Sequence, residues 1–357
     1  MSAGNVGRVA AGWRPECGVS TQADGVVSLN GTTFHYVDRG RGRGYDGVHR
    51  QPGGRHEGTA MRAHVECIDE RDYIAHLAEF VRAEGTAVQK NLSYDEEDGS
   101  CSAKVRFVSD WRRPAGVHHA ETEWFILSGE VQLGDTTLRD GGYWMAPTGV
   151  WTPRLRVKAG TEILLYREYG AWGFDEADQD RPNVRADQQL VVKRSGSEPW
   201  IPVEMGSPMR FDLGGSPVPG LFIKMLHRDE KTGFYTRLIK AKPGWKEHPL
   251  AHHPVFEESY CLGGRFEYNF GSMWPGTYSF RPALIRHGDF AAAEETGCTW
   301  IIRCDGDLVD WYTTDARIEM LGTPTNYGPD FANTVMATLP TPVRSRSMGA
   351  MPDPGYR

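Results

Sequence analysis

The sequence predicts an all-β protein made of two related β-domains. Its 357 residues include 42 glycines and 22 prolines, which indicate frequent turns. Between the turns lie short runs rich in Val, Thr, Phe, Tyr and Trp, which are typical of strands. Two strand-rich regions share one sequence pattern, and a domain size of roughly 150 residues also gives two domains.

Five segments are expected along the chain. The first is rich in Gly and Arg and lacks periodicity, so it is expected to form an irregular arm, and the last has proline and glycine throughout. The expected bounds are 1–60 for the N-terminal arm, 61–172 for the first barrel, 173–199 for a charged linker, 200–315 for the second barrel and 316–357 for the tail.

One amphipathic helix is expected over residues 69–85, DERDYIAHLAEFVRAEG. The run ends at Gly85, as a helix with a glycine stop does. Its apolar side chains fall on one helical face: Tyr73, Leu77, Phe80 and Val81.

Charge and composition exclude several classes of binding partner. The net charge of −7 includes no basic stripe, which argues against nucleic acid and anionic membranes. The six cysteines form no C-x-x-C pair, the N-terminus lacks a secretory apolar core, and nucleotide-binding and serine-hydrolase motifs are missing. We therefore expect a cytoplasmic protein that acts on a small molecule.

Both copies of the repeat contain His-His, three residues and Glu, followed by an aromatic strand that ends at Gly129 or Gly264. In the second copy, EHPLAHHPVFEESYCLGG, His253 and Glu257 stand four residues apart at a strand edge. With His287 from a distant strand they can converge inside a barrel. Such ligands hold Fe(II), Mn(II), Ni(II) or Zn(II) and leave positions open for substrate.

These residues carry a family resemblance. The pattern G-x₅-H-x-H-x₃₋₄-E-x₆-G, followed by G-x₅-P-x-G-x₂-H, is that of the cupins, and the chain resembles a bicupin over about 90–170 and 215–313. Its second half is most similar to the cupins related to the ChrR anti-sigma factor and to the acetylacetone- and dihydroxyacetophenone-cleaving dioxygenases. The resemblance implies two double-stranded β-helix (jelly-roll) barrels with metal ligands pointing inward.

The second copy fits the pattern with one departure among the ligand positions. Glu257 lies seven residues before Gly264, and His287 lies five after Pro282, as the pattern requires. Ala251 stands where the family has its first histidine. Either His252 or His248 supplies the missing imidazole, or the metal has three protein ligands. The candidate ligands are therefore His252, His253, Glu257 and His287.

The first copy fits less well. The position seven before Gly129 is Thr122, and the position five after Pro147 is Thr152, where the family has histidine. A hydroxyl replaces imidazole as a ligand only with a large loss of affinity. A structural role is expected for this barrel, although it retains possible ligands: His118, His119, Glu121 and Glu123.

Arg237, Tyr260 and Arg286 come from strands or turns beside the proposed site. An arginine there can bind a carboxylate or enolate, and an aromatic ring can form a wall. We expect these three residues to contact substrate.

These residues and the resemblance together imply a mononuclear non-haem oxygenase, most simply a dioxygenase. It would use one divalent metal, and Fe(II) is the first choice. The alternatives are a non-redox isomerase, lyase or hydrolase with Zn(II) or Mn(II), and a metal-binding sensor. An anti-sigma sensor usually carries a separate helical sigma-binding domain, whereas one helix is expected before the first barrel here, which favours the enzyme. The arm and tail favour a homodimer, since they can cover exposed strand edges.

Overall fold

The computed structural model describes residues 25–29, 32–36, 62–95, 99–168, 172–178, 188–203, 210–211, 220–306 and 308–313. The chain divides into two units, Met1–Arg50 and Gln51–Arg357. In the first unit, β1 (Gly25–Leu29) and β2 (Thr32–Tyr36) form an antiparallel hairpin. This hairpin lies within the segment expected to be an irregular arm, and Asn-Gly, as at positions 30–31, is a dipeptide that favours two-residue hairpin turns.

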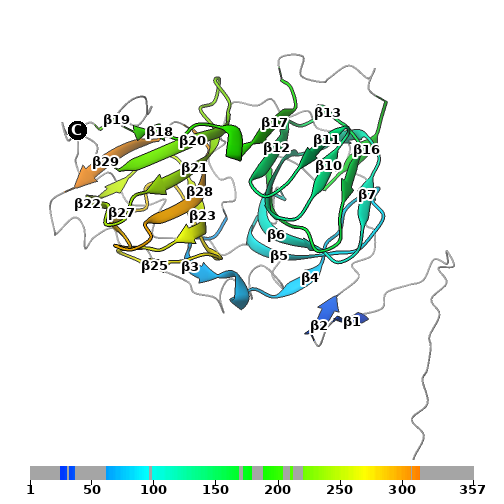
Figure 1. Ribbon diagram of the computed structural model, residues 1–357, viewed down its shortest axis with the longest axis horizontal. Coiled ribbons are helices and arrows are strands. Elements are labelled where there is room, and N and C mark those ends of the chain that lie inside the picture. Colours follow the sequence, from blue (N-terminus) through cyan, green and yellow to red (C-terminus); the bar gives the residue numbers. More distant parts are fainter. Residues whose placement is uncertain are drawn as a thin grey trace, which may run out of the picture. The chain divides into compact units, whose positions relative to one another are not determined.

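The second unit contains two barrels of β-strands, which confirms the all-β fold (Figure 1). None of the helices in the described part of the chain has the length and hydropathy to cross a bilayer. The helical elements whose full extent is described are the single-turn 3₁₀ helices η1 (Glu70–Asp72) and η2 (Ser195–Ser197).

The first barrel has three antiparallel sheets. In spatial order, the seven-stranded sheet comprises β17 (Val191–Arg194), β12 (Gly142–Ala146), β9 (Glu121–Ser128), β15 (Glu162–Glu168), β6 (Cys101–Phe107), β5 (Ala87–Tyr94) and β4 (Ala75–Leu77). The four-stranded sheet comprises β11 (Thr136–Leu138), β10 (Val131–Leu133), β14 (Leu155–Val157) and β7 (Trp111–Arg113). The three-stranded sheet comprises β13 (Trp151–Thr152), β8 (Gly116–His118) and β16 (Phe174–Glu176).

The second barrel has two sheets, in which β19 and β29 pair in parallel and the other pairs are antiparallel. The seven-stranded sheet comprises β18 (Ile201–Pro202), β20 (Leu221–Arg228), β21 (Tyr235–Ala241), β28 (Cys298–Cys304), β23 (Glu257–Gly264), β26 (Thr277–Arg281) and β3 (Val65–Asp69). The six-stranded sheet comprises β19 (Arg210–Phe211), β29 (Val309–Thr313), β22 (Lys246–His252), β27 (His287–Ala292), β24 (Phe266–Tyr268) and β25 (Gly271–Met273).

Edge strands do not follow the expected segment bounds. β3 lies within the segment assigned to the first barrel, yet it pairs with β26 of the second. Both β16 and β17 lie within the segment expected to be a linker, and they pair with β8 and β12 of the first barrel. Long-range pairing of this kind covers sheet edges that would otherwise be exposed.

The helix expected over 69–85 is not formed. Asp69 accepts from the backbone of Arg71 at the start of η1, and the chain then extends into β4, which pairs with β5. Phe80 stacks on Phe107 and contacts the Trp111 ring, whereas Ile74 and Val81 are exposed. Helical periodicity gave the wrong element because edge pairing and aromatic packing outweigh intrinsic propensity.

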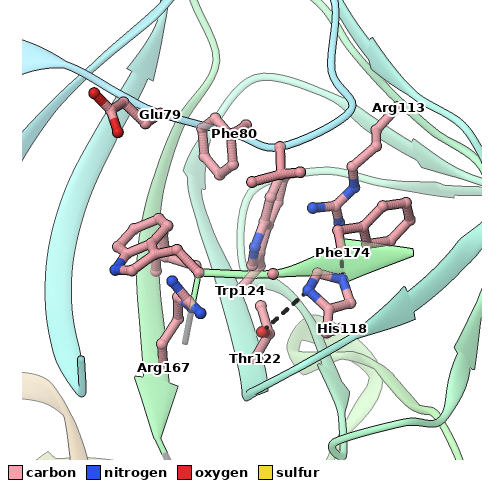
Figure 2. Close-up of a pocket in the computed structure, with 12 residues that line it drawn as sticks. Glu79, Phe80, Arg113, His118, Thr122, Trp124, Arg167 and Phe174 are labelled. Atoms are coloured by element: carbon pink, nitrogen blue, oxygen red, sulfur yellow. Dashed lines mark hydrogen bonds between the residues drawn. The ribbon is translucent and has the colours of Figure 1, made fainter. Parts of the chain in front are cut away.

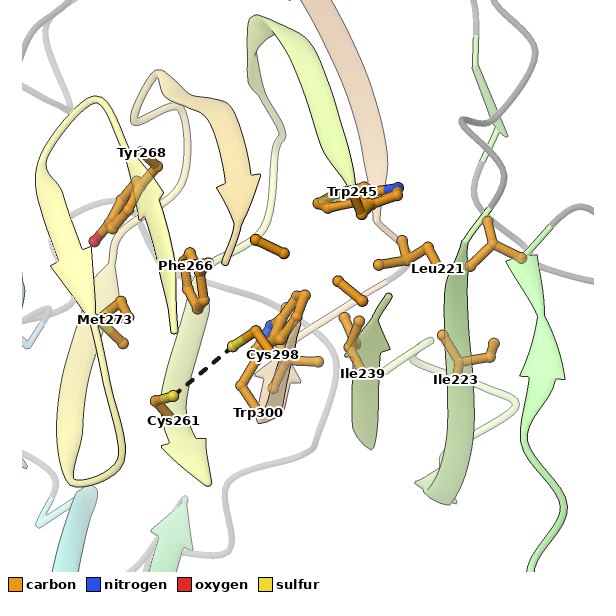
Figure 3. Packing of buried hydrophobic residues seen from close by; sticks show 14 of the residues in the cluster. Leu221, Ile223, Ile239, Trp245, Cys261, Phe266, Tyr268, Met273, Cys298 and Trp300 are labelled. Atoms are coloured by element: carbon orange, nitrogen blue, oxygen red, sulfur yellow. Dashed lines mark hydrogen bonds between the residues drawn. The ribbon is translucent and has the colours of Figure 1, made fainter. Parts of the chain in front are cut away.

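Three apolar clusters form the core. One fills the first barrel around Trp124 and Trp144, and a second fills the second barrel around Phe266 and Trp300 (Figure 3). The third includes residues of both seven-stranded sheets, among them Tyr166 of β15 and Tyr278 of β26. The two barrels therefore share a buried apolar interface.

Candidate metal centre

Three side chains of the second barrel come together as the sequence predicts. Glu257 begins β23, His287 begins β27, and His253 follows the end of β22. One ligand atom from each lies within 4.8 Å of the others, and all three side chains are buried. Among the described residues, these three form the group of His, Cys, Asp and Glu side chains that is placed to hold a metal ion.

The two imidazoles are held in the orientation of metal ligands. Nδ1 of His253 lies 2.8 Å from the carbonyl oxygen of Val255, and Nδ1 of His287 lies 2.9 Å from that of Ile285. Because a carbonyl only accepts, each Nδ1 carries the proton and donates it, leaving the lone pair on Nε2. Carbonyls that fix ligand tautomers in this way are typical of metal sites.

Both Nε2 atoms face one carboxylate oxygen. Oε2 of Glu257 lies 3.2 Å from Nε2 of His253 and 3.5 Å from Nε2 of His287. Donor atoms about 2.1 Å from one ion, at angles of about 90° to 110°, lie about 3.0 to 3.4 Å apart. The two spacings are therefore close to those expected of two imidazoles and one carboxylate that bind a single ion.

The other oxygen of Glu257 is held by an ion-pair network. Arg281 donates from Nη1 to Oε1 of Glu257 at 2.5 Å and from Nε to Glu66 at 2.8 Å. Glu66 in turn lies 2.9 Å from His64. Burial opposes ionisation of Glu257, but the positive groups around it, among them Arg281 at Oε1, hold its pKa well below the usual range. An ionised carboxylate suits a divalent cation.

Sequence reasoning missed this network. Arg281 directly precedes Pro282 of the recognised pattern and so could have been noticed. His64 and Glu66 could not, because they reach the second barrel only through the long-range pairing of β3 with β26.

A largely apolar cavity opens beside the three ligands. Its lining includes Glu257 and His287 together with the apolar walls Leu221, Ile239, Trp245, Phe266, Phe290, Trp300, Ile302 and Leu308. Ala251 also lines it, so the position of the absent family histidine faces open space. Arg237 lies in the same wall and is 1% exposed. None of its three guanidinium nitrogens has a hydrogen-bond partner in the described part of the chain.

The other expected site residues lie elsewhere. His252 is buried but outside the three-residue group, and its neighbour Ala251 faces the cavity instead. Tyr260 points to the opposite face of β23 and donates to Glu70, because side chains alternate along a strand. Arg286 is buried before His287 but does not line the cavity. The side chain of His248 lies outside the described residues.

The first barrel retains one of the three equivalent side chains. His118 aligns with His253, but Thr122 and Thr152 stand at the positions of the other two ligands. Nε2 of His118, the nitrogen that would face an ion, instead lies 2.8 Å from Nη2 of Arg113. The other possible ligands lie apart from it: Glu123 pairs with Arg303, and His119 with Asp175.

Comparison with solved structures supports the cupin fold. A Nostoc punctiforme protein, provisionally described as a dioxygenase, matches with 19% identity over 70% of this chain and 87% of its own, at a TM-score of 0.59. An oxalate decarboxylase from Bacillus subtilis matches with 13% identity over 72% of this chain and 80% of its own, with a TM-score of 0.45. The protein YlbA from E. coli matches with 17% identity over 71% of this chain and 97% of its own, with a TM-score of 0.44.

At these identities the first match shows the cupin fold alone, and the other two add nothing to it. No curated protein sequence matches the chain significantly. A family model described as Domain of unknown function DUF4437 matches residues 66–311. Because this match covers more than half of the chain, the protein belongs to the DUF4437 family.

Proposed function

We propose that the protein is a mononuclear metal-dependent enzyme whose second barrel oxidises a small organic anion. The observation that carries the proposal is a group of three metal donors beside a largely apolar cavity that contains an arginine. Two of the donors come from imidazoles whose tautomers are fixed by backbone carbonyls. The provisional dioxygenase description of the Nostoc punctiforme protein agrees with this proposal.

His253, Glu257 and His287 would hold the ion, and their donor set fits Fe(II), Mn(II), Ni(II) and Zn(II). With three protein ligands, a bound ion would leave positions open for substrate, and as Fe(II) it would supply redox chemistry toward O₂. Arg281 orients the carboxylate of Glu257, and the two backbone carbonyls orient the imidazoles.

Arg237 would bind the anionic group of the substrate. Burying a guanidinium without a partner is costly, and a carboxylate or enolate that accepts two hydrogen bonds in the guanidinium plane removes that cost. The Tyr235 ring centroid lies 4.5 Å from the guanidinium carbon, so one face of the fork is already supported. The aromatic walls of Trp245, Phe266 and Trp300 would exclude water from the reacting group.

Oxygen consumption tests the proposal. Protein reconstituted with Fe(II) should consume O₂ only when a small chelating anion is added, and a panel of β-dicarbonyls, hydroxylated aromatic ketones and their carboxylated analogues provides candidates. Glu257→Ala should abolish consumption. Arg237→Met should raise KM for carboxylated substrates more than it changes kcat, since it removes a binding contact.

Two results would overturn the assignment. Turnover that proceeds equally without oxygen would identify a non-redox enzyme that uses the ion as a Lewis acid. Tight metal binding with no turnover of any compound in the panel would favour the sensor.

A further inference from the structure

The first barrel has its own cavity, remote from the candidate metal centre. Figure 2 shows Arg113 reaching toward the ring of His118, which lies between it and Thr122. Further lining residues come from the aromatic side chains Phe80, Trp124, Trp172 and Phe174 and from Arg167. This cavity occupies the place in the first barrel that the metal ligands occupy in the second.

A chain of hydrogen bonds fixes the protonation of this group. Arg113 can only donate, so Nε2 of His118 accepts, and its proton is on Nδ1. Nδ1 lies 3.2 Å from the hydroxyl of Thr122, which donates to the carbonyl of Ala120 at 3.1 Å. His118 is therefore neutral, and burial together with the Arg113 charge lowers its pKa well below the usual range.

Arg113 carries a buried charge that no described residue neutralises. Its side chain is 5% exposed, its Nε has no hydrogen-bond partner among the described residues, and its polar contact is with neutral His118. Glu79, the carboxylate of the lining, is exposed and makes no ion pair with it. By contrast, the equally buried Arg62 and Arg303 each pair with carboxylates.

The electrostatics agree with this geometry. Burial and the nearby Arg167 lower the pKa of Arg113 to about 9, whereas the carboxylates around Arg303 outweigh burial and raise the pKa of that guanidinium. The guanidinium carbon of Arg113 lies 4.3 Å from the Phe174 ring centroid, and that of Arg167 lies 3.9 Å from the Trp172 ring centroid. Each guanidinium is thus stacked on one face, and the edge of the Arg113 guanidinium is left for further hydrogen bonds.

We propose that the first barrel is a binding site for a small organic carboxylate with a flat apolar body. The carboxylate would take the free edge of the Arg113 guanidinium, where a charge-assisted hydrogen bond compensates the buried charge. The apolar body would lie against Phe80, Trp124 and Trp172. In this duplicated protein, an arginine positioned by a neutral histidine thus holds an anion where the other copy holds three metal donors.

Binding of 4-fluorobenzoate, followed by fluorine NMR and calorimetry, tests the site in the full-length protein. The uncharged 4-fluorobenzamide has nearly the same shape and serves as the matched probe. Because Arg237 of the second barrel could also take a carboxylate, the measurement is made in an Arg237→Met background. There, 4-fluorobenzoate should bind at one site, and 4-fluorobenzamide should bind at least roughly tenfold more weakly.

Adding Arg113→Met should weaken 4-fluorobenzoate binding by roughly tenfold or more, since a charged hydrogen-bonding partner is lost. Arg154→Met, an exposed arginine of the same barrel, should leave it unchanged. Arg113→Lys keeps the charge without the fork and should bind at an intermediate level, which guards against a folding defect in the methionine variant. Equal affinity for the amide, no detectable binding of the acid, or binding unaffected by Arg113→Met would each overturn the proposal.

Discussion

Arg303 of β28 joins the two barrels, and replacing it should reveal how strongly the interface depends on buried charge. Its side chain is 1% exposed. It donates to Glu123 at 2.7 Å and to Glu168 at 3.2 Å in the first barrel, and to Glu258 in the second. Arg303→Met keeps the length of the side chain. It leaves Glu168 and Glu258 with Arg62 as their guanidinium partner, and it removes the guanidinium that pairs with Glu123.

Removing one partner from a buried ion pair typically costs about 3 to 5 kcal/mol, because the remaining charges stay buried. Burial already raises the pKa of Glu168, although Arg62 and Arg303 oppose that effect. Without Arg303 the carboxylates will take up protons more readily. The loss in free energy of unfolding should therefore be largest near about pH 8 and smaller near about pH 5.5.

Arg237→Met is the matched control, since Arg237 is equally buried in the same barrel but has no hydrogen-bond partner among the described residues. Its replacement should leave the free energy of unfolding unchanged or raise it. Urea unfolding of the wild type and both variants measures the difference. An Arg303→Met variant within about 1 kcal/mol of wild type, or an equal loss in Arg237→Met, would refute this reasoning.

Two further predictions concern the second barrel. Although burial opposes it, Arg281 and His64 lower the pKa of Glu66 to about 2. The ionised Glu66 should contribute about 3 kcal/mol to the free energy of unfolding above about pH 4.5, and this contribution should be lost as the pH falls toward 2. In urea unfolding, the difference between wild type and Glu66→Gln should therefore shrink over that pH range. A difference that stays constant with pH would contradict the prediction. A Cβ at Gly264 would lie 2.1 Å from the carbonyl oxygen of Gly297, whereas one at Gly160 meets nothing within 4 Å. Because both glycines have positive φ, thermal unfolding should show that Gly160→Ala lowers the free energy of unfolding by about 1 kcal/mol and that Gly264→Ala lowers it clearly more. Equal losses in the two variants would count against the close contact at Gly264.

Much of the site could be predicted because its signal is local. His253 and Glu257 lie four residues apart at the start of one strand, and His287 follows Pro282 at the spacing of the recognised pattern. The repeat likewise gave the two barrels. The choice among His248, His252 and three ligands depended on which way each side chain points, and the structure gives a three-residue group with Ala251 facing the cavity.

The rest of the site depends on pairing between strands that are distant in the sequence. Tyr260 is an exception, because it stands three positions after Glu257 on one strand and alternation alone places it on the opposite face. The exchange of β3 between segments brings Glu66 to Arg281, a contact spanning 215 positions along the chain that no local pattern encodes. The homodimer expected from the arm and tail stays a prediction.

Leu284 illustrates a departure that the fold accommodates. It stands where the recognised pattern has glycine, yet it keeps the left-handed conformation with φ of 70°, and its amide donates to the carbonyl of His253. The first barrel has Gly149 at the equivalent position, with φ of 73°. The turn before His287 is thus preserved at the cost of strain in a non-glycine residue, which is typical of functional sites.

Metal content tests the central claim most directly. Elemental analysis of anaerobically purified protein should find about one divalent ion per chain in the wild type and in Thr152→Ala, whose residue takes the equivalent of the His287 position in the first barrel. His287→Ala and Glu257→Ala should each lose the ion, because each removes one of three protein donors. Full retention of metal by the His287→Ala variant would contradict the assignment of the second barrel as the metal centre.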